Sequence, residues 1–520
     1  MQAQRHRRPR LAPLLSAAAA CVLGGCLAPR YARPPVAAPE GFKEAAAAQY
    51  EQAPPGTWRP AQPRDAAVKG KWWELFGEPE LNALEEQLDI NNQNIAQFFQ
   101  NFMAARAQVG EARASYFPTL TTSPAYSVTQ SPSTLSGASQ AAATGSTAAS
   151  ASVPLFTGRH TQITLPFDAS WEPDLWGRVR NTVAQYRYAA QVSAADLENE
   201  RLTEQADLAV FYFQLRGQDA LQDLYKRTIA AYRESLELTR TLVETGIDSD
   251  EDLAAAELVL RNAEATAEGI ATNRAIYEHA IATLIGQPAP SLTMPVKALS
   301  TPVPPIPVTI PSTLLERRPD IAAAERTLAQ VNAQIGAERA AYFPTLDLTA
   351  GGGFTSSVIN TLLTAPARYW SLGASASETL FDAGLRKATL AQYWAQYNAD
   401  VAAYRQTVLT AFQQVEDYTA TLRITSRQLE RQRAAVQAAE SYLKIVTVRY
   451  QMGIDPYLNV MTAQVNLLAD QQTEVLLRVA EMVAAAQLVQ ALGGGWDVSQ
   501  LPAASEVTTH QALEQAAHPH

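Results

Sequence analysis

The sequence predicts a mainly α-helical protein that crosses a membrane with β-strands and is built from two structural repeats. The segment Ala107–Leu120 returns as Ala333–Leu346 after a shift of 226 residues. Gly246-Ile247-Asp248 returns as Gly453-Ile454-Asp455 after a shift of 207. Such long-range self-similarity indicates that one supersecondary unit occurs twice. No stretch beyond the N-terminal leader reaches the roughly 18 consecutive apolar residues of a transmembrane helix, so strands would have to cross the membrane.

The elements follow the same order in both halves. A helix-period segment (81–102; 321–335) ends at Phe-Pro, because proline cannot continue a helix. Two strand-like segments come next, and then a long helix and a return helix. The expected strands lie near 120–130 and 161–172, then 345–355 and 369–381. The expected long helices cover about 179–245 and 385–452, and the return helices end near Gly286 and Gly493.

Domain boundaries follow from this order and from composition. Residues 121–157 are rich in Ser, Thr, Ala and Gly and predict a longer exposed loop in the first half. The predicted divisions are a signal peptide (1–25), an extended N-terminal segment (26–77), a first repeat (78–287), a Pro-rich connector (288–310), a second repeat (311–495) and a polar tail (496–520).

The first 26 residues predict secretion and a lipid anchor. Four arginines precede the apolar run Leu11–Leu23, and Leu23-Gly24-Gly25-Cys26 resembles a bacterial lipobox. Cys26 would then carry diacylglyceryl and N-acyl chains, the only covalent group expected. Leu27, rather than Asp, favours the outer membrane in lipoproteins of this kind. The alternative is a free or buried cysteine behind an ordinary signal peptide.

Composition limits the function classes. The 520 residues include 47% hydrophobic side chains and carry a formal net charge of -10, which argues against nucleic acid as the main partner. Two cysteines and six histidines leave little material for a metal site, and no metal or other cofactor is expected. No Gly-x-Ser-x-Gly or His-Glu-x-x-His motif occurs, so no catalytic residue is predicted.

Four strands per chain predict an assembly. Strands of about ten residues fit a tilted transmembrane barrel, but four cannot close, and open edges in lipid leave backbone groups without partners. Other copies of the chain would have to complete the sheet. The alternative is a small soluble pair of hairpins packed on the helices.

Several motifs carry a family resemblance. Pro311–Ile321 contains Arg317-Arg318-Pro319-Asp320, and Leu380-Phe381-Asp382 and Ala491–Trp496 follow in order. With Trp72-Trp73 and the run after Cys26, this pattern resembles the NodT/OprM branch of TolC-type outer-membrane efflux lipoproteins over nearly the whole chain.

The resemblance implies a homotrimer in the outer membrane of a Gram-negative bacterium, in contact with outer-membrane lipid. Each copy would give four strands to a twelve-stranded transmembrane β-barrel, continuous with a long periplasmic α-helical barrel and a mixed equatorial region. The channel would be passive and would export drugs or toxic small molecules. A periplasmic adaptor would join it to an inner-membrane pump of the resistance-nodulation-division type. Alternatives are the exit duct of a type I protein-secretion system and a non-conducting structural envelope lipoprotein.

The resemblance also implies a gate at the periplasmic helix tips, around two glycines, Gly246 and Gly453. Asp252 and Tyr450 match a hydrogen-bonded pair that holds such tips closed. Relatives commonly carry Asp where this chain has Thr462 and, three residues earlier, Asn459. The expected gate residues are Asp248, Asp252, Tyr450, Asp455, Leu458, Asn459 and Thr462. A plain alternative for the acids is a solvated helix N-terminus, and both glycines fit helix C-caps with positive φ.

Overall fold

The structure is a computed structural model, and it describes residues 29, 31–36, 39, 41–44, 70–130, 159–297, 299, 301–306, 316–496 and 498–503. The predicted signal peptide, Cys26, most of the predicted 121–157 loop and most of the polar tail lie outside the described residues. The chain divides into two compact units, and each unit takes segments from both repeats.

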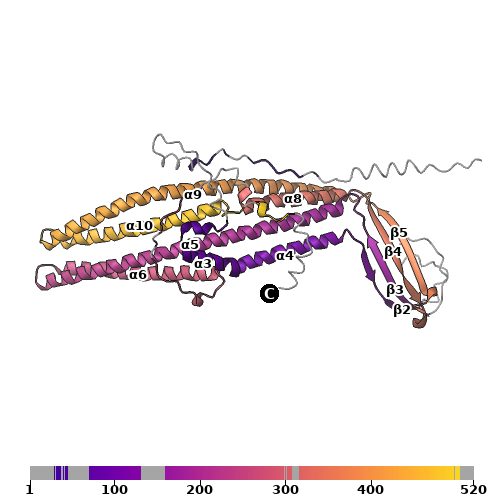
Figure 1. Cartoon of the computed structure of the whole chain (residues 1–520), viewed down its shortest axis with the longest axis horizontal. Helices are drawn as coiled ribbons and strands as arrows, with labels where there is room; N and C mark the ends of the chain where they lie inside the picture. Colours follow the sequence, from indigo (N-terminus) through magenta and orange to yellow (C-terminus); the bar gives the residue numbers. More distant parts are fainter. Residues whose placement is uncertain are drawn as a thin grey trace, which may run out of the picture. The chain divides into compact units, whose positions relative to one another are not determined.

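The first unit (1–31, 107–186 and 330–397) contains one antiparallel sheet. Its strands are β1 (Thr119–Thr122), β2 (Ala125–Gln130), β3 (Arg159–Trp171), β4 (Thr345–Ser356) and β5 (Arg368–Ser377). The order is β1-β3-β4-β5, with β2 also paired to β3. The four predicted strand regions are therefore confirmed, and β3 and β4 form the centre of the sheet (Figure 1).

The first predicted strand is broken into two pieces on the same edge. Thr122 pairs with Phe167, and Ala125 pairs with Thr164, so β1 and β2 lie end to end along β3. Pro124 lies in the gap between them, where a residue without an N–H cannot donate to the ladder. The last strand ends at Ser377, four residues before the predicted limit of 381.

The second unit (32–106, 187–329 and 398–520) is mostly helical. The α-helices of the described residues, some of which continue into the first unit, are α3 (Pro79–Asn91), α4 (Gln93–Ala114), α5 (Arg178–Glu244), α6 (Asp250–Leu284), α8 (Pro319–Ala340), α9 (Leu385–Gln451) and α10 (Tyr457–Ala491). Within this unit, α6 returns along α5 and α10 returns along α9 (Figure 1). No helix of the described residues is long and apolar enough to cross a membrane.

The helix boundaries recur with constant shifts in the two halves of the chain. Adding 207 to both ends of α5 and α6 gives both ends of α9 and α10. Adding 226 to both ends of α4 gives both ends of α8. The helical segment predicted from residue 81 onward differs in one respect, since it is two helices that meet at Asn92.

The aromatic residues before α3 pack in the core of the second unit. Trp72, Trp73 and Phe76 belong to a short 3-10 helix, η2 (Trp72–Phe76), and are each at most 3% exposed. Phe76 lies against Phe213 of α5, with ring centroids 5.0 Å apart. These contacts give the aromatic cluster a packing role.

The arginine of the Arg-Pro-Asp motif has a structural role that the repeat makes visible. Arg318 donates to the carbonyl oxygen of Ala491, the last residue of α10, at 3.2 Å. In the first repeat Asn92 donates to the carbonyl oxygen of Leu284, the last residue of α6, at 2.8 Å. Each side chain satisfies a carbonyl that the helix end leaves without an intrahelical donor.

One buried acid in this core has a predicted pH signature. Glu85 is fully buried, and neither of its carboxylate oxygens has a hydrogen-bond partner among the described residues. Burial, with a smaller contribution from Asp89, raises the pKa of Glu85 well above its ordinary value. The folded state therefore holds this proton more tightly than the unfolded chain.

Stability should fall as the pH rises from the ordinary glutamate pKa of about 4.3 through the raised pKa of Glu85. Glu85→Gln removes the titrating group, so we expect its melting temperature to vary less with pH over this window than that of the parent. Thermal melts of both proteins at several pH values measure the difference. Parallel pH profiles would contradict the assignment.

Candidate functional site

Two turns form the tips of the helical hairpins of the second unit. At the α5 end, the N–H of Gly246 donates to Val243 O and the N–H of Ile247 donates to Leu242 O. Gly453 and Ile454 repeat this pattern at the α9 end. Gly246 has φ +73° and Gly453 has φ +68°. The predicted glycine C-caps are confirmed, since a left-handed residue at this position closes the last turn.

Tyr450 links the two turns. Its hydroxyl donates to the Oδ2 atom of Asp248, so the last turn of α9 is bonded to the α5–α6 turn. The Tyr450 side chain is only 7% exposed. Burial, followed by the hydrogen bond to Asp248, raises the pKa of the tyrosine. The phenol therefore stays protonated and remains a donor at neutral pH. We call this contact the tip latch.

The predicted pairing of Tyr450 with Asp252 is wrong within the protomer, because Asp252 belongs to a helix cap. The hydroxyl of Ser249 donates to the Asp252 carboxylate at 2.8 Å, and Ser249 Oγ accepts from the Asp252 N–H at 3.2 Å. This is a reciprocal capping arrangement at the start of α6. The Ser-x-x-Asp spacing, visible in the sequence, indicates it.

Asp455 forms an ion pair within the α9–α10 turn. The guanidinium of Arg449 donates to both Asp455 oxygens, at 2.6 and 3.0 Å. A hydrogen bond from Arg449, aided by its charge, lowers the pKa of Asp455. Asp248 and Asp455 thus occupy equivalent positions in the two repeats but have different partners. Three acids of the tips, Asp248, Asp252 and Asp455, are hydrogen-bonded to side chains and are not simply solvated.

The three remaining predicted gate residues lie on the first turns of α10. Leu458 is 57% exposed. Thr462 is also exposed, and its hydroxyl donates to Leu458 O at 2.8 Å within the helix. Asn459 is half-buried and donates its backbone N–H to Pro456 O at 3.1 Å. Together these residues present an apolar and neutral polar surface rather than a carboxylate one.

A tyrosine series that the sequence analysis missed joins α5 to α10. Tyr225 donates to Gln472 at 3.1 Å, and Tyr232 donates to the backbone oxygen of Gln464, also at 3.1 Å. Tyr457 packs edge-on against Tyr450, with centroids 5.4 Å apart. Burial raises the pKa of Tyr232 to about 12. Tyr225 and Tyr232 are seven residues apart, a spacing that places them on one helix face and could have indicated the contact.

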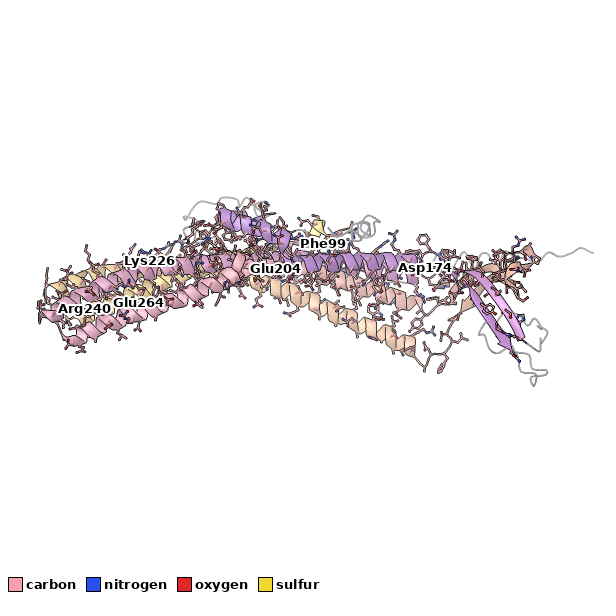
Figure 2. The ribbon with its side chains drawn as sticks, turned by 90° about the horizontal axis from the view of Figure 1, so that it is seen from below. Phe99, Asp174, Glu204, Lys226, Arg240 and Glu264 are labelled. Carbon is pink, nitrogen blue, oxygen red and sulfur yellow. The ribbon has the colours of Figure 1, made fainter. Side chains whose placement is uncertain are left out.

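The outer faces of the hairpins are charged. Figure 2 labels Lys226 and Arg240 on α5 and Glu264 on α6 in this part of the second unit. Arg233 bonds to Glu264 at 2.7 Å across α5 and α6. The tips also expose apolar side chains beside their acids, since Ile247, Met452 and Ile454 are 70%, 68% and 58% exposed. A cluster of exposed apolar side chains of this kind is typical of a docking surface.

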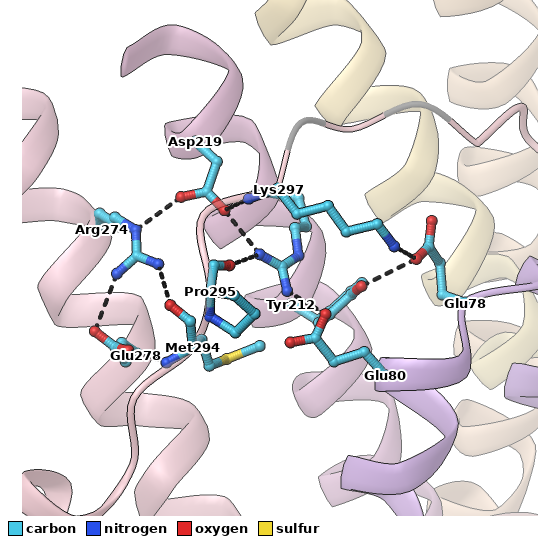
Figure 3. A network of polar contacts seen from close by, with 10 residues as sticks. Glu78, Glu80, Tyr212, Asp219, Arg274, Glu278, Met294, Pro295 and Lys297 are labelled. Carbon is cyan, nitrogen blue, oxygen red and sulfur yellow. Dashed lines mark hydrogen bonds and ion pairs between the residues drawn. The ribbon is translucent and has the colours of Figure 1, made fainter. Parts of the chain in front are cut away.

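A buried polar network farther along α5 was also missed (Figure 3). Asp219 accepts from Arg216 at 2.8 Å, from Arg274 of α6 at 2.7 Å and from the backbone N–H of Lys297 at 3.0 Å. Arg216 also donates to Pro295 O at 2.7 Å. The network fixes the connector between the repeats to α5 and α6.

Glu78 extends this network to α3. It accepts from Tyr212 at 3.1 Å, from Lys297 at 2.6 Å and from the hydroxyl of Thr301. Burial alone would raise the pKa of Glu78, but these hydrogen bonds outweigh it and hold the pKa below its ordinary value. In the part of the chain that the structure describes, no group of His, Cys, Asp or Glu is arranged to hold a metal ion.

Comparison with known proteins agrees with this architecture. The outer membrane efflux protein family matches residues 84–287 and 310–494. The toluene efflux pump outer membrane protein TtgC and the antibiotic efflux pump outer membrane protein ArpC, both of Pseudomonas putida, are each 32% identical over 483 residues. These alignments cover 92% of this chain and 95% of each relative.

Among solved structures, the outer-membrane channel OprN is 26% identical, with a TM-score of 0.78. The alignment covers 90% of this chain and 99% of OprN. The match to the family and its relatives covers both repeats, and the fold is that of the TolC-like channels. The chain belongs to the outer membrane efflux protein family and is an outer-membrane efflux channel.

Proposed function

We propose that this chain forms a passive trimeric duct that exports toxic small organic molecules and antibiotics and is closed at its helix tips. The observation that carries the proposal is full-length similarity to proteins named for toluene and antibiotic efflux. These names favour small-molecule efflux over protein secretion. Membership of a channel family also argues against an enzyme, in agreement with the absence of a catalytic motif from the sequence.

The sheet supports the trimer. Among the described strands, β5 and the β1/β2 edge each have a partner on one side only. Lipid cannot satisfy the backbone groups of an open edge. Pairing of β5 with the β1/β2 edge of the next copy would close a barrel of twelve strand positions from three chains.

The exposed apolar residues of the helix tips support the binding of a partner protein. Ile247 and Ile454 place an exposed apolar side chain on each of two neighbouring turns. An adaptor protein in the periplasm that presents an apolar end would bury them, and an inner-membrane pump of the resistance-nodulation-division type would supply the energy. We further propose that Cys26 carries the lipid anchor expected from the lipobox.

The tip latch gives the proposed gate a direct test. Tyr450→Phe removes only the hydroxyl that donates to Asp248. A hydrogen bond to a charged group contributes about 1.5–3 kcal/mol, so its loss should shift the closed-to-open ratio by roughly tenfold or more. We therefore expect a higher open probability in single-channel recordings of the purified protein in a planar bilayer. Asp248→Asn should act in the same direction.

Two variants serve as controls. Tyr442→Phe changes a tyrosine of the same helix that is 51% exposed, and Asp252→Asn changes the acid that caps α6. Both should conduct like the parent. If Tyr450→Phe matched the parent while the parent itself conducted, the tip latch would not hold the gate. Absence of conductance from intact trimers of every variant would contradict the channel itself.

A further inference from the structure

Four described residues near the N-terminus, at positions 33 and 42–44, contact one face of α9. Arg33 donates to the Tyr404 hydroxyl at 3.0 Å, and Phe42 packs edge-on against Phe412, with centroids 6.3 Å apart. The α9 residues that these described residues contact are Tyr404, Phe412, Glu416 and Arg423. Their spacings of eight, four and seven residues place them on a single helix face over five turns. We call the described residues 33–36, 39 and 41–44 the strap.

Glu416 and Glu44 anchor the end of the strap. The backbone N–H groups of Lys43 and Glu44 donate to the two carboxylate oxygens of Glu416, at 2.7 and 3.0 Å. The Glu44 carboxylate in turn accepts from the guanidinium of Arg423. Phe42 is only 4% exposed, so the contact is a packed one and not merely a surface approach.

The internal repeat shows that Arg423 has a counterpart. A shift of 207 residues relates Arg423 on α9 to Arg216 on α5, which binds the connector through Pro295 O. The connector precedes the second repeat, and it is bound to the long helix of the first. The strap precedes the first repeat, and it is bound to the long helix of the second. Each long helix is therefore held by the extended segment that precedes the other repeat.

The two attachments differ in strength. Arg216 is 2% exposed and shares the fully buried carboxylate of Asp219. The position equivalent to Asp219 in the second repeat is Ser426, which has no negative charge. Arg423 therefore depends on Glu44, and both side chains of that pair are 20% exposed. A partly solvated single ion pair is easier to break than a buried network.

We propose that the strap positions α9. Of the two attachments, the Glu44–Arg423 pair is the one that can be released, whereas the Arg216 network keeps the connector bound. α9 carries Tyr450 of the tip latch at its far end, so a helix free to shift at residues 404–423 favours opening at the tip. This inference rests on the proposed channel function. It assigns Glu44, Glu416 and Arg423 as positioning residues of the gate.

The experiment measures strap release and channel opening in the same full-length trimers. Trypsin cleavage of the Lys43–Glu44 bond reports release, and single-channel open probability reports opening. Glu44→Gln and Arg423→Gln should each raise the cleavage rate about tenfold or more, because cleavage follows the population of the released state. Each should also raise the open probability roughly threefold or more. The exchange Glu44→Arg with Arg423→Glu keeps one charge of each sign and should return the open probability toward the parent. Its cleavage rate is not compared, because trypsin would also cleave after the arginine introduced at position 44.

Arg431→Gln is the matched control, since it removes the same charge from an exposed position eight residues farther along α9. It should change neither value. Faster cleavage without a change in open probability would overturn the positioning role, as would unchanged cleavage in both single variants. If Tyr450→Phe opened the channel and the strap variants did not, the strap inference alone would fail. If Tyr450→Phe also had no effect, the proposed gate itself would fail.

Discussion

Replacing Gly493 with alanine should prevent stable folding of the junction between α10 and α8. Gly493 has φ +95°, and a Cβ atom built on it would lie 2.0 Å from the carbonyl oxygen of Arg317. The left-handed conformation costs a non-glycine residue about 1–2 kcal/mol, and overpacking typically adds about 1–3 kcal/mol. Here the obstacle is backbone, which has no rotamer to change. We expect a large fall in melting temperature and in trimer yield.

The first repeat contains an equivalent glycine, so the same substitution can be tested there. Gly286 is equivalent to Gly493 by the shift of 207, with φ +70° and a built Cβ 2.3 Å from the carbonyl oxygen of Asn91. Asn91 is itself equivalent to Arg317 by the shift of 226. Gly286→Ala should therefore destabilise the protein to a similar degree. Both repeats keep a glycine here because the end of a return helix passes against the backbone that precedes α4 or α8.

Gly453→Ala is the matched control for both variants. Gly453 also has positive φ, +68°, but a built Cβ would meet nothing within 4 Å. Its replacement by alanine should lower the free energy of unfolding only by the cost of the left-handed backbone conformation, about 1–2 kcal/mol. Melting curves followed by circular dichroism at one scan rate would compare the three variants. If Gly493→Ala and Gly453→Ala melted together, close backbone approach would not be the reason for the glycine.

The helices could be predicted well from the sequence because the repeat shows the pattern of each helix twice, once in each half of the chain. The predicted long helices, 179–245 and 385–452, differ from α5 and α9 by at most one residue at either end. The break at Asn92 was not predicted, because Asn91 and Asn92 interrupt no apolar pattern. It depends on a tertiary contact, the hydrogen bond from Asn92 to Leu284 O, about 190 residues away.

The candidate site was predicted only in part, for the same reason. Gly246 and Gly453 were placed at helix ends because helix ends have local signals, whereas Tyr450 was taken from the family resemblance. The partner of Tyr450 was misassigned, since Asp248 and Asp252 lie four residues apart and only the packed turns determine which one faces the tyrosine. The network around Asp219 joins α3, α5, α6 and the connector, and no sequence spacing relates residues from four separate segments.

That network carries the second large prediction, the effect of Asp219→Asn. The substitution keeps the shape of the side chain but removes the charge shared by Arg216 and Arg274, whose side chains are 2% and 13% exposed. Removing one partner of a buried ion pair costs about 3–5 kcal/mol when the remaining charge has no other partner. Here Arg216 keeps Glu80 at 2.5 Å and Arg274 keeps Glu278 at 3.1 Å, so we expect the lower end of this range. The connector should also loosen, since Asp219 accepts the N–H of Lys297 at 3.0 Å. We expect a strongly lowered melting temperature and faster proteolysis near residue 297.

Asp223→Asn gives the comparison that isolates burial. Asp223 lies one turn farther along α5 and pairs with Arg227 at 3.1 Å, but these side chains are 57% and 72% exposed. An exposed pair of this kind contributes about 0–1 kcal/mol, so its loss should leave the melting temperature almost unchanged. Equal melting temperatures for the two variants would mean that the buried network contributes no more than a surface ion pair. A large difference would show that the buried network around Asp219 holds the connector much more strongly than the Glu44–Arg423 pair holds the strap.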